Sequence, residues 1–389
     1  MVNPLGNALS DVSVLDFSTN VAGPYATMVL RDFGAPILKI ERRGAGDPSR
    51  AMDPKAGASS AVYESLNRGK ASLALDLKRE EDVATALGLV EEHQVLVESF
   101  RPGVMDRLGL GYEAVRRRNP GIIYCSVSGF GYEGMGRDMK AYDPLIQAFA
   151  GHLEMTGDKD GQPSRSGASL VDVSAGMWSA LGILSALRLP VNERGVHLQV
   201  SLLDSIMAFM AHQVAAATAT GRDLERLGSD SPLLAPYGAF KASDKPLMIA
   251  SGNDTHFQQL TSALGTPEIA SHPDFTTNAA RVANRQELRE LLEGGLASRT
   301  SEEWIGVLTA AGVPCGPVNT LLEALDDPLV ANRGVIGQLD DSVMKYVRNP
   351  VRVDLEPIDL TTPAPRLGSH QLSKTATSNT GPKPDKEIP

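Results

Sequence analysis

Residues 12–40 read VSVLDFSTNVAGPYATMVLRDFGAPILKI. Two short apolar runs, at residues 12–17 and 37–40, flank a helical pattern of apolar residues over residues 23–33. A strand, a helix and a second strand of these lengths are typical of a crossover between parallel strands of one sheet. This stretch therefore predicts a parallel sheet with crossover helices.

The same alternation continues along the chain. Further strands are predicted at residues 73–77, 95–98, 122–127, 197–202 and 247–250, and further helices at residues 80–91, 142–150, 172–187, 203–217, 255–264, 285–296 and 301–311. We therefore predict an α/β fold: a Rossmann-like, doubly wound parallel sheet in a large domain, plus a smaller α/β domain. The large domain is expected at residues 1–225 and the small one at 226–330. Residues 369–389 are polar and contain prolines, which predicts a loose tail.

Composition excludes several classes of protein. The chain has 389 residues, 42% of them hydrophobic, and a net charge of -10. A nucleic-acid-binding surface is normally basic, so none is expected. Any anionic ligand must instead meet a local group of cations, and the first domain offers Arg42, Arg43, Arg50, Arg68, Lys70, Arg101, Arg107 and Lys140.

The two cysteines and the N-terminus bear on location. Cys125 and Cys315 have no metal-ligand spacing and are expected to be reduced thiols, which fits the cytoplasm. The N-terminus lacks a signal-peptide pattern, and no stretch approaches the roughly 18 uncharged apolar residues of a membrane span. A membrane protein is therefore not expected.

A single carboxylate marks the candidate reactive group. Residues 167–183 read GASLVDVSAGMWSALGI, in which Asp172 follows two apolar residues and opens a helix of small residues. At a helix start a carboxylate accepts backbone N–H bonds, feels the helix dipole and is expected to stay ionised, as a nucleophile requires. The alternative is that Asp172 is only a helix cap, contributing about 1 kcal/mol.

A series of motifs then decides between these interpretations. In chain order they are VLDFSTNVAGPYATM at 14–28, LKIERRGAGD at 38–47, NRGK at 67–70, LALDL at 73–77, VESFRPG at 97–103, SVSGFG at 126–131 and AYD at 141–143. Together with the Asp172 segment they resemble the class III CoA-transferase family, which includes formyl-CoA transferase, carnitine CoA-transferase and the α-methylacyl-CoA racemases. The resemblance spans about residues 10–368. It implies that residues 331–368 return to the large domain and that two chains interlock as a homodimer.

The resemblance also implies the chemistry. Asp172 would attack an acyl-CoA donor such as succinyl-CoA to form an aspartyl anhydride and then an aspartyl-CoA thioester, from which a small carboxylic acid takes CoA. Coenzyme A is the only cofactor implied, as substrate and product, with no metal and no redox group. The expected partners are acyl-CoA, carboxylic acids and a second copy of the chain.

Similarity to formyl-CoA transferase places the CoA contacts residue by residue. They are Val21, Ala22, Arg42, Leu75, Ser99, Phe100, Arg107, Lys140 and Tyr142. Ser99 stands where asparagine is common, and Val21 stands where the formyl enzyme has a glutamine over the reaction centre. The second departure argues against formyl-CoA or oxalate as substrate. Small dicarboxylates are plausible acceptors, with Arg165 as one cation that could hold the distal carboxylate.

A second segment resembles the loop that closes over the reaction centre. Ser251, Gly252 and Asn253 follow the predicted strand at 247–250. A plain strand-to-helix turn with Asp254 as helix cap would predict the same residues.

The sequence also offers alternatives to this function. GFGYEG at 129–134 matches the dinucleotide fingerprint, but no helix pattern follows it, so we interpret it as part of an active-site loop. A racemase of the same family would use a histidine at the position of Tyr142, whose reference pKa near 10 makes it a poor base at neutral pH. A CoA-binding relative without catalytic activity remains a third alternative.

Overall fold

The protein consists of two compact units in a computed structural model. The structure describes residues 3–57, 59–340 and 344–371. The first unit comprises Met1–Asp143, Leu170–Phe209 and the chain from Gly334 onward; the second comprises Pro144–Ser169 and Met210–Arg333. Residues 144–169 and 210–225, which the sequence placed in the large domain, thus belong to the second unit.

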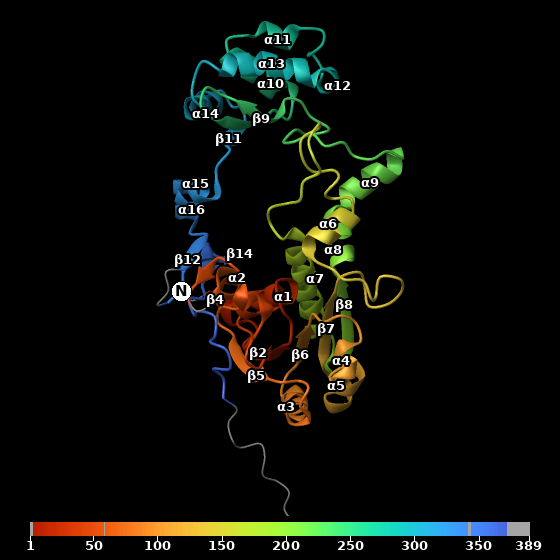
Figure 1. Cartoon of the computed structure of the whole chain (residues 1–389). Coiled ribbons are helices and arrows are strands. Elements are labelled where there is room, and N and C mark those ends of the chain that lie inside the picture. Colours follow the sequence, from red (N-terminus) through yellow and green to blue (C-terminus); the bar gives the residue numbers. More distant parts are fainter. Residues whose placement is uncertain (1–2, 58, 341–343, 372–389) are drawn as a thin grey trace, which may run out of the picture. The chain divides into compact units, whose positions relative to one another are not determined.

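The first unit contains a six-stranded sheet. Its strands are β1 Val14–Asp16, β2 Ile37–Arg42, β5 Ala71–Leu75, β6 Val95–Glu98, β7 Ile123–Ser128 and β8 Val196–Ser201. The strand order is β5-β2-β1-β6-β7-β8, and every neighbouring pair is parallel (Figure 1). In chain order this is 3-2-1-4-5-6, the order of the Rossmann fold. The predicted parallel α/β sheet is confirmed.

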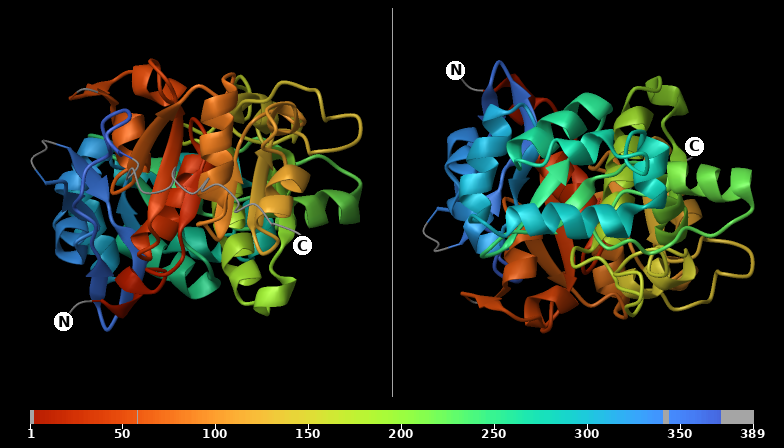
Figure 2. Two further views of the ribbon diagram at one scale, coloured as in Figure 1. Left: turned by 90° about the horizontal axis from the view of Figure 1, so that it is seen from below. Right: turned by 90° about the horizontal axis from the view of Figure 1, so that it is seen from above.

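Helices cover both faces of this sheet, because successive strand residues point to opposite sides. Val14 and Val97 pack in one apolar cluster, whereas Leu15 and Leu96 pack in another. The first cluster includes side chains of α1 (Ala22–Asp32) and α7 (Leu170–Leu187). The second includes side chains of α3 (Glu80–Val90), α4 (Val104–Arg107) and α5 (Tyr112–Arg118). Figure 2 shows the sheet between these two layers.

A glycine brings α1 and α7 close together. A Cβ added to Gly176 of α7 would lie only 2.7 Å from the carbonyl oxygen of Ala22 in α1. A larger residue would therefore force the two helices apart. This close packing places the first turns of both helices at the same end of the sheet.

The composition of α7 bears on one expectation. This 18-residue helix is long and apolar enough to cross a membrane by length and composition alone, as α8 (Leu202–Phe209) and α9 (Ala211–Thr220) would be if counted as one span. The expectation concerned uncharged apolar stretches, and α7 comes near that limit although it contains Asp172. The buried face of α7 packs on α1 and on the sheet, which is also how the core helix of an α/β protein behaves.

The second unit has its own core around a three-stranded antiparallel sheet in the order β11-β10-β9. Its elements are α9, β9 Tyr237–Lys241, β10 Pro246–Ala250, α10 Asp254–Ala263, α11 Glu268–Ser271, α12 Asn278–Ala283, α13 Arg285–Leu296, α14 Ser301–Ala310, β11 Cys315–Pro317, α15 Leu321–Asp326 and α16 Pro328–Arg333. The strand predicted at 247–250 and three helices are confirmed. The helix predicted at 203–217 is instead interrupted at Met210.

The C-terminal part of the chain reaches the edge of the large sheet. Its elements are β12 Ile336–Gln338, β13 Lys345–Val347, β14 Asn349–Val353 and β15 Glu356–Ile358. Nearer the N-terminus the first unit also contains three short elements, β3 Lys55–Ala56, β4 Ser59–Ser60 and α2 Ala61–Leu66. The N–H groups of Gly368 and His370 donate to the hydroxyl and carbonyl oxygens of Ser72 in β5, at 3.0 and 2.8 Å. Of the tail predicted at 369–389, residues 372–389 lie outside the described residues.

Candidate active site

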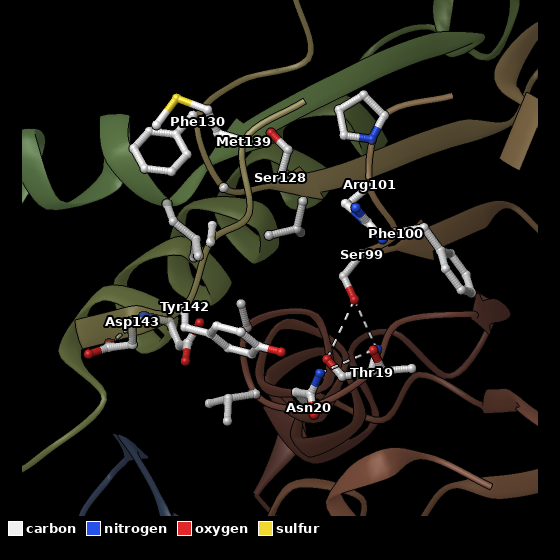
Figure 3. A pocket seen from close by; sticks show the side chains of 18 of the residues that line it. Thr19, Asn20, Ser99, Phe100, Arg101, Ser128, Phe130, Met139, Tyr142 and Asp143 are labelled. Carbon is white, nitrogen blue, oxygen red and sulfur yellow. Dashed lines mark hydrogen bonds between the residues drawn. The ribbon is translucent and has the colours of Figure 1, made fainter. Parts of the chain in front are cut away.

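The site lies where the strand order of the sheet reverses. The chain leaves β1 towards α1 on one face and leaves the neighbouring β6 towards α4 on the other face. Such a divergence opens a crevice at the carboxyl ends of the strands. A cavity of about 160 Å³ occupies it, lined by residues 19–22, 99–102, 127–130, 139 and 141–143, with Arg137, Asp172 and Leu202. Figure 3 shows this cavity.

Asp172 lies in the wall of this cavity but does not cap its helix. It is the third residue of α7, which begins at Leu170. Asp143 provides the cap: its Oδ2 accepts from the N–H groups of Val171 and Asp172 at 2.9 and 3.3 Å. Within the part of the chain that the structure describes, the Asp172 carboxylate itself has no hydrogen-bond partner. The alternative that Asp172 is only a helix cap is therefore wrong.

The ionisation of Asp172 also differs from the expectation. Burial, and to a smaller extent the nearby Asp143 carboxylate, raise its pKa to about 7. The expected stabilisation by backbone N–H groups is missing because Asp143 already accepts from them. In the ligand-free protein Asp172 is thus partly protonated at neutral pH, and its carboxylate is more basic than an ordinary aspartate.

A buried ionic cluster holds the loop opposite Asp172. Lys39 Nζ lies 3.0 Å from Asp47 Oδ2 and 3.9 Å from Asp16 Oδ2, and it donates to the carbonyl oxygen of Ser18 at 2.7 Å. Asp47 Oδ1 accepts from the N–H of Asn20 at 3.2 Å. Asn20 has a φ of 63°, a left-handed conformation that few residues other than glycine adopt. The cluster thus stabilises an unusual backbone at the cavity wall.

A second, larger cavity adjoins the first. It has a volume of about 680 Å³ and lies at the carboxyl ends of β1, β2 and β5. Arg42 and Lys78 line it beside apolar residues such as Leu75 and Leu108. Thr19 and Phe100 line both cavities. A long ligand with an anionic end could therefore extend from the second cavity towards Asp172.

Comparison with known proteins identifies this arrangement. The family model described as "CoA-transferase family III" matches residues 9–371. The chain belongs to the class III CoA-transferase family. It is 40% identical over 344 residues to the "Acetyl-CoA:oxalate CoA-transferase" of Acetobacter aceti, covering 87% of each protein. It is 34% identical over 379 residues to the "Succinate--glutarate CoA-transferase" of Agrobacterium fabrum, covering 95% of each.

A solved structure agrees with this assignment. The "CAIB/BAIF family protein" of Brucella suis superposes with a TM-score of 0.85 at 33% identity, covering 95% of this chain and 98% of that one. The protein is therefore a class III CoA-transferase, an enzyme whose named relatives transfer CoA between acids.

The positions expected to contact CoA divide into three groups in this transferase. Val21, Ala22, Ser99, Phe100 and Tyr142 line the cavity that contains Asp172. Arg42 and Leu75 line the larger cavity, together with Phe100. Arg107 and Lys140 are exposed and are not among the residues that line either cavity.

Four of the candidate cations form ion pairs within the protein: Arg43 pairs with Asp82 at 3.0 Å but is half-exposed, whereas the other three pairs are buried. Arg50 pairs with Glu41 at 2.7 Å, Arg68 with Asp32 at 2.7 Å, and Lys70 with Asp16 at 3.0 Å. Buried charges in such pairs are costly to separate. These three side chains therefore stabilise the fold and are poor candidates for phosphate contacts.

Ser99 joins two of the segments that line the cavity. Its Oγ accepts from the N–H of Thr19 at 2.9 Å and lies 3.5 Å from the Thr19 carbonyl oxygen, to which its hydroxyl donates (Figure 3). The serine that stands in place of asparagine thus ties the turn after β6 to the loop after β1.

The candidate closing loop lies in the second unit, after β10. Asn253, not Asp254, is the helix cap: its side chain accepts from the N–H of His256 at 2.8 Å. Asp254 is the first residue of α10 and pairs with Arg281 at 2.7 Å. The cap assigned to Asp254 from the sequence was therefore wrong. Arg165 also lies in the second unit and is exposed.

Sequence reasoning did not identify Asp143 as part of the site. The signal was present, because an aspartate directly before Pro144 is typical of a helix start. Its hydrogen bonds to a helix that begins 27 residues later could not be read from that pattern. Among the described residues, no group of three or more His, Cys, Asp or Glu side chains is placed to hold a metal ion.

Proposed function

We propose that this transferase moves CoA from an acyl-CoA donor to a small carboxylic acid through covalent intermediates on Asp172. The observation that carries the proposal is an unpartnered carboxylate in a cavity whose lining includes five of the expected CoA contacts. A carboxylate without competing hydrogen bonds, and with a pKa raised to about 7, is a good nucleophile near neutral pH.

Four bond exchanges complete the reaction. The Asp172 carboxylate attacks the thioester carbonyl, the C–S bond breaks, and CoA leaves as a thiolate. The thiolate attacks the aspartyl carbonyl of the resulting anhydride, which releases the donor acid and forms an aspartyl-CoA thioester. The acceptor carboxylate displaces CoA to form a second anhydride. The thiolate then attacks its acyl carbonyl, which yields the new acyl-CoA and free Asp172.

The start of α1 supports charge stabilisation in these steps. Val21 precedes the helix without a side-chain hydrogen bond to its first turn, and Val21 and Ala22 line the cavity. Backbone N–H groups of an uncapped first turn can bind a developing oxyanion. No metal or redox group is required by this route. Closure by Ser251, Gly252 and Asn253 would exclude water from the anhydride and remains part of the proposal.

The acids to test follow from the relatives. Named relatives use succinate with glutarate, or acetyl-CoA with oxalate. Val21 argues against oxalate, whereas the 40% identity to an oxalate enzyme favours it. We propose a small mono- or dicarboxylate as acceptor, with succinyl-CoA and acetyl-CoA as the first donors to test.

An exposed apolar face supports a homodimer. Met177, Trp178 and Leu181 of α7 are 51%, 49% and 51% exposed, and Phe209 of α8 is 59% exposed. Apolar faces of this kind usually mark a contact with another chain. We propose a dimer through this face, to be tested by light scattering of the purified protein. We also propose a cytoplasmic location, testable by cell fractionation, since both cysteines are free.

Mass spectrometry tests the function directly. The purified protein is mixed with a panel of acyl-CoA donors and free acids, and CoA exchange is followed while hydroxylamine traps activated Asp172. Exchange with a hydroxamate at Asp172 is the expected result. Solvent deuterium entering the α-position of a branched acyl-CoA without exchange would instead indicate a racemase. CoA binding with neither reaction would indicate a non-catalytic relative.

A further inference from the structure

Glu98 is a buried carboxylate that the proposed reaction does not use. It is the last residue of β6 and is fully buried. Its Oε2 accepts from the N–H of Phe100 at 2.8 Å, and its Oε1 accepts from the Tyr132 hydroxyl at 3.3 Å. Within the described part of the chain it forms no ion pair. These two hydrogen bonds and one with the Ser126 side chain offset part of its burial, which raises the pKa of Glu98 to about 7.

Phe100 and Tyr132 belong to segments that form different walls of the Asp172 cavity. Phe100 lies in the turn at 99–102, which lines that cavity and, through Phe100, the larger cavity as well. Tyr132 lies in the glycine-rich loop at 129–141, whose residues Phe130 and Arg137 line the Asp172 cavity. One carboxylate therefore connects the turn to the loop.

The glycine-rich loop is irregular in structure. It contains no helix or strand, and Gly131 and Gly134 have φ values of 103° and 73°. Several hydrogen bonds are local, such as those from Arg137 N–H to the Gly134 carbonyl and from Met139 N–H to the Gly136 carbonyl. The Tyr132 ring, by contrast, packs edge-on against His197 of β8, with ring centroids 5.5 Å apart. Tyr132 thus anchors the loop to the sheet.

The anchored loop places a cation beside another cation. A Cβ on Gly103 would lie 3.2 Å from Nη2 of Arg137 and 3.4 Å from Nη1 of Arg107, so the two guanidinium groups are close neighbours. Neither has a carboxylate partner in the described chain. Like charges this close repel unless an anion lies between or beside them. A ligand phosphate would satisfy both.

We propose that Glu98 is a positioning residue for CoA: through Phe100 and Tyr132 it holds the turn and the glycine-rich loop in the arrangement that binds the coenzyme. The inference rests on the proposed function. Asp172 lies on α7, whereas the hydrogen bonds described for Glu98 go to Phe100, Ser126 and Tyr132, so the chemical step should be largely independent of Glu98.

Tyr132→Phe tests the inference, because it removes one hydroxyl and keeps the ring against His197. We expect the dissociation constant for free CoA and the KM for acyl-CoA to rise by up to about tenfold, the effect of one lost hydrogen bond. The value of kcat should change less than about twofold. Glu98→Gln, which keeps the shape of the side chain, should weaken CoA binding in the same direction.

Tyr112→Phe is the matched control. Its ring stacks on the same His197 with centroids 4.8 Å apart, but its hydroxyl donates to the Gly195 carbonyl at 2.7 Å and not to Glu98. We expect this variant to lose some thermal stability and to keep the CoA dissociation constant of the wild type. A purely structural role of the aromatic cluster predicts equal effects of both variants.

Calorimetric titration of the folded proteins with free CoA separates the outcomes. Unchanged CoA affinity in Tyr132→Phe, or equal losses in Tyr112→Phe, would overturn the role of Glu98 while leaving transfer activity in place. A wild type that binds no CoA would overturn the proposed function and this inference together. Tyr132→Phe is conservative enough to fold, which thermal melting would verify.

Discussion

Two aspartates of the large unit show opposite responses to burial. Asp16 at the end of β1 is fully buried, yet Lys39 and Lys70, with hydrogen bonds from Ser18 and Thr27, more than offset that burial and hold its pKa well below the usual range. Asp172 has no such partners, so burial and Asp143 raise its pKa to about 7.

The difference separates a structural carboxylate from a reactive one. At Asp16 the charge is neutralised by partners, which makes the group inert and its removal costly. At Asp172 the charge is not neutralised, which makes the group basic and leaves its oxygen atoms free to attack a substrate. Burial alone therefore does not indicate function, whereas burial without partners does.

The largest expected effect is on turnover. Asp172→Ala should lower CoA transfer by at least about a thousandfold, as expected when a covalent nucleophile is removed. Calorimetry should still detect CoA binding, because most predicted contacts lie on other segments. Transfer at wild-type rates by this variant would refute the role of Asp172.

The second effect is on stability at the other aspartate. Lys70→Met should lower the free energy of unfolding by about 3–5 kcal/mol, because Asp16 and Asn67 lose a buried partner. Urea unfolding at pH 7 measures the loss. The double variant Asp16→Asn with Lys70→Met is the control and should recover part of it, since no unpaired carboxylate remains. A single variant as stable as the wild type would contradict this description of the cluster.

The third effect is on the pH dependence of stability, and here removing the charge of Asp172 should stabilise the protein. Its pKa is raised in the folded state, so between about pH 4 and 7 the folded protein holds a proton that the unfolded chain has released, and stability falls as pH rises through that window. At pH 8 the free energy of unfolding of Asp172→Asn, measured with urea, should therefore exceed that of the wild type by on the order of 2 kcal/mol. At pH 4 the two free energies should be nearly equal. An equal gain at both pH values would contradict the raised pKa.

The smallest effect is a shift in the pH profile. If the ionised form of Asp172 attacks, kcat/KM should fall as pH drops through about 7. Asp143→Asn removes the second cause of the raised pKa, so the fall should move to lower pH. The shift should be partial, because burial is the larger cause and remains. A profile that moves to higher pH would show that Asp143 acts mainly through the helix cap.

The sequence predicted regular elements better than irregular ones. The strand at 95–98 and the helix at 285–296 appear with the predicted bounds, because the first is a short continuous apolar run and the second has apolar residues at helical spacing. Strands β9 and β11 were missed: both are edge strands, and β11 contains Gly316 and Pro317, which are rare in strands. The break at Met210 was missed because no proline or glycine marks it.

The candidate site was also predicted only in part. Val21, Ser99 and Tyr142 each lie within a recognisable motif, and the structure places all three around one cavity with Asp172. The Arg50, Arg68 and Lys70 side chains carry the same charge as a phosphate-binding cation, and only their buried partners reveal a different role.

The sequence alone determined the parallel α/β architecture, the family and the candidate nucleophile, because periodicity and motifs are local properties of the chain. The strand order, the helix cap by Asp143 and the raised pKa of Asp172 were decided by the tertiary structure. Each depends on which residues distant in the sequence become neighbours, and on how much water they exclude. Hydrogen bonding and desolvation at Asp172 are set by those neighbours, so the reactivity of this carboxylate could not be read from its position in the chain.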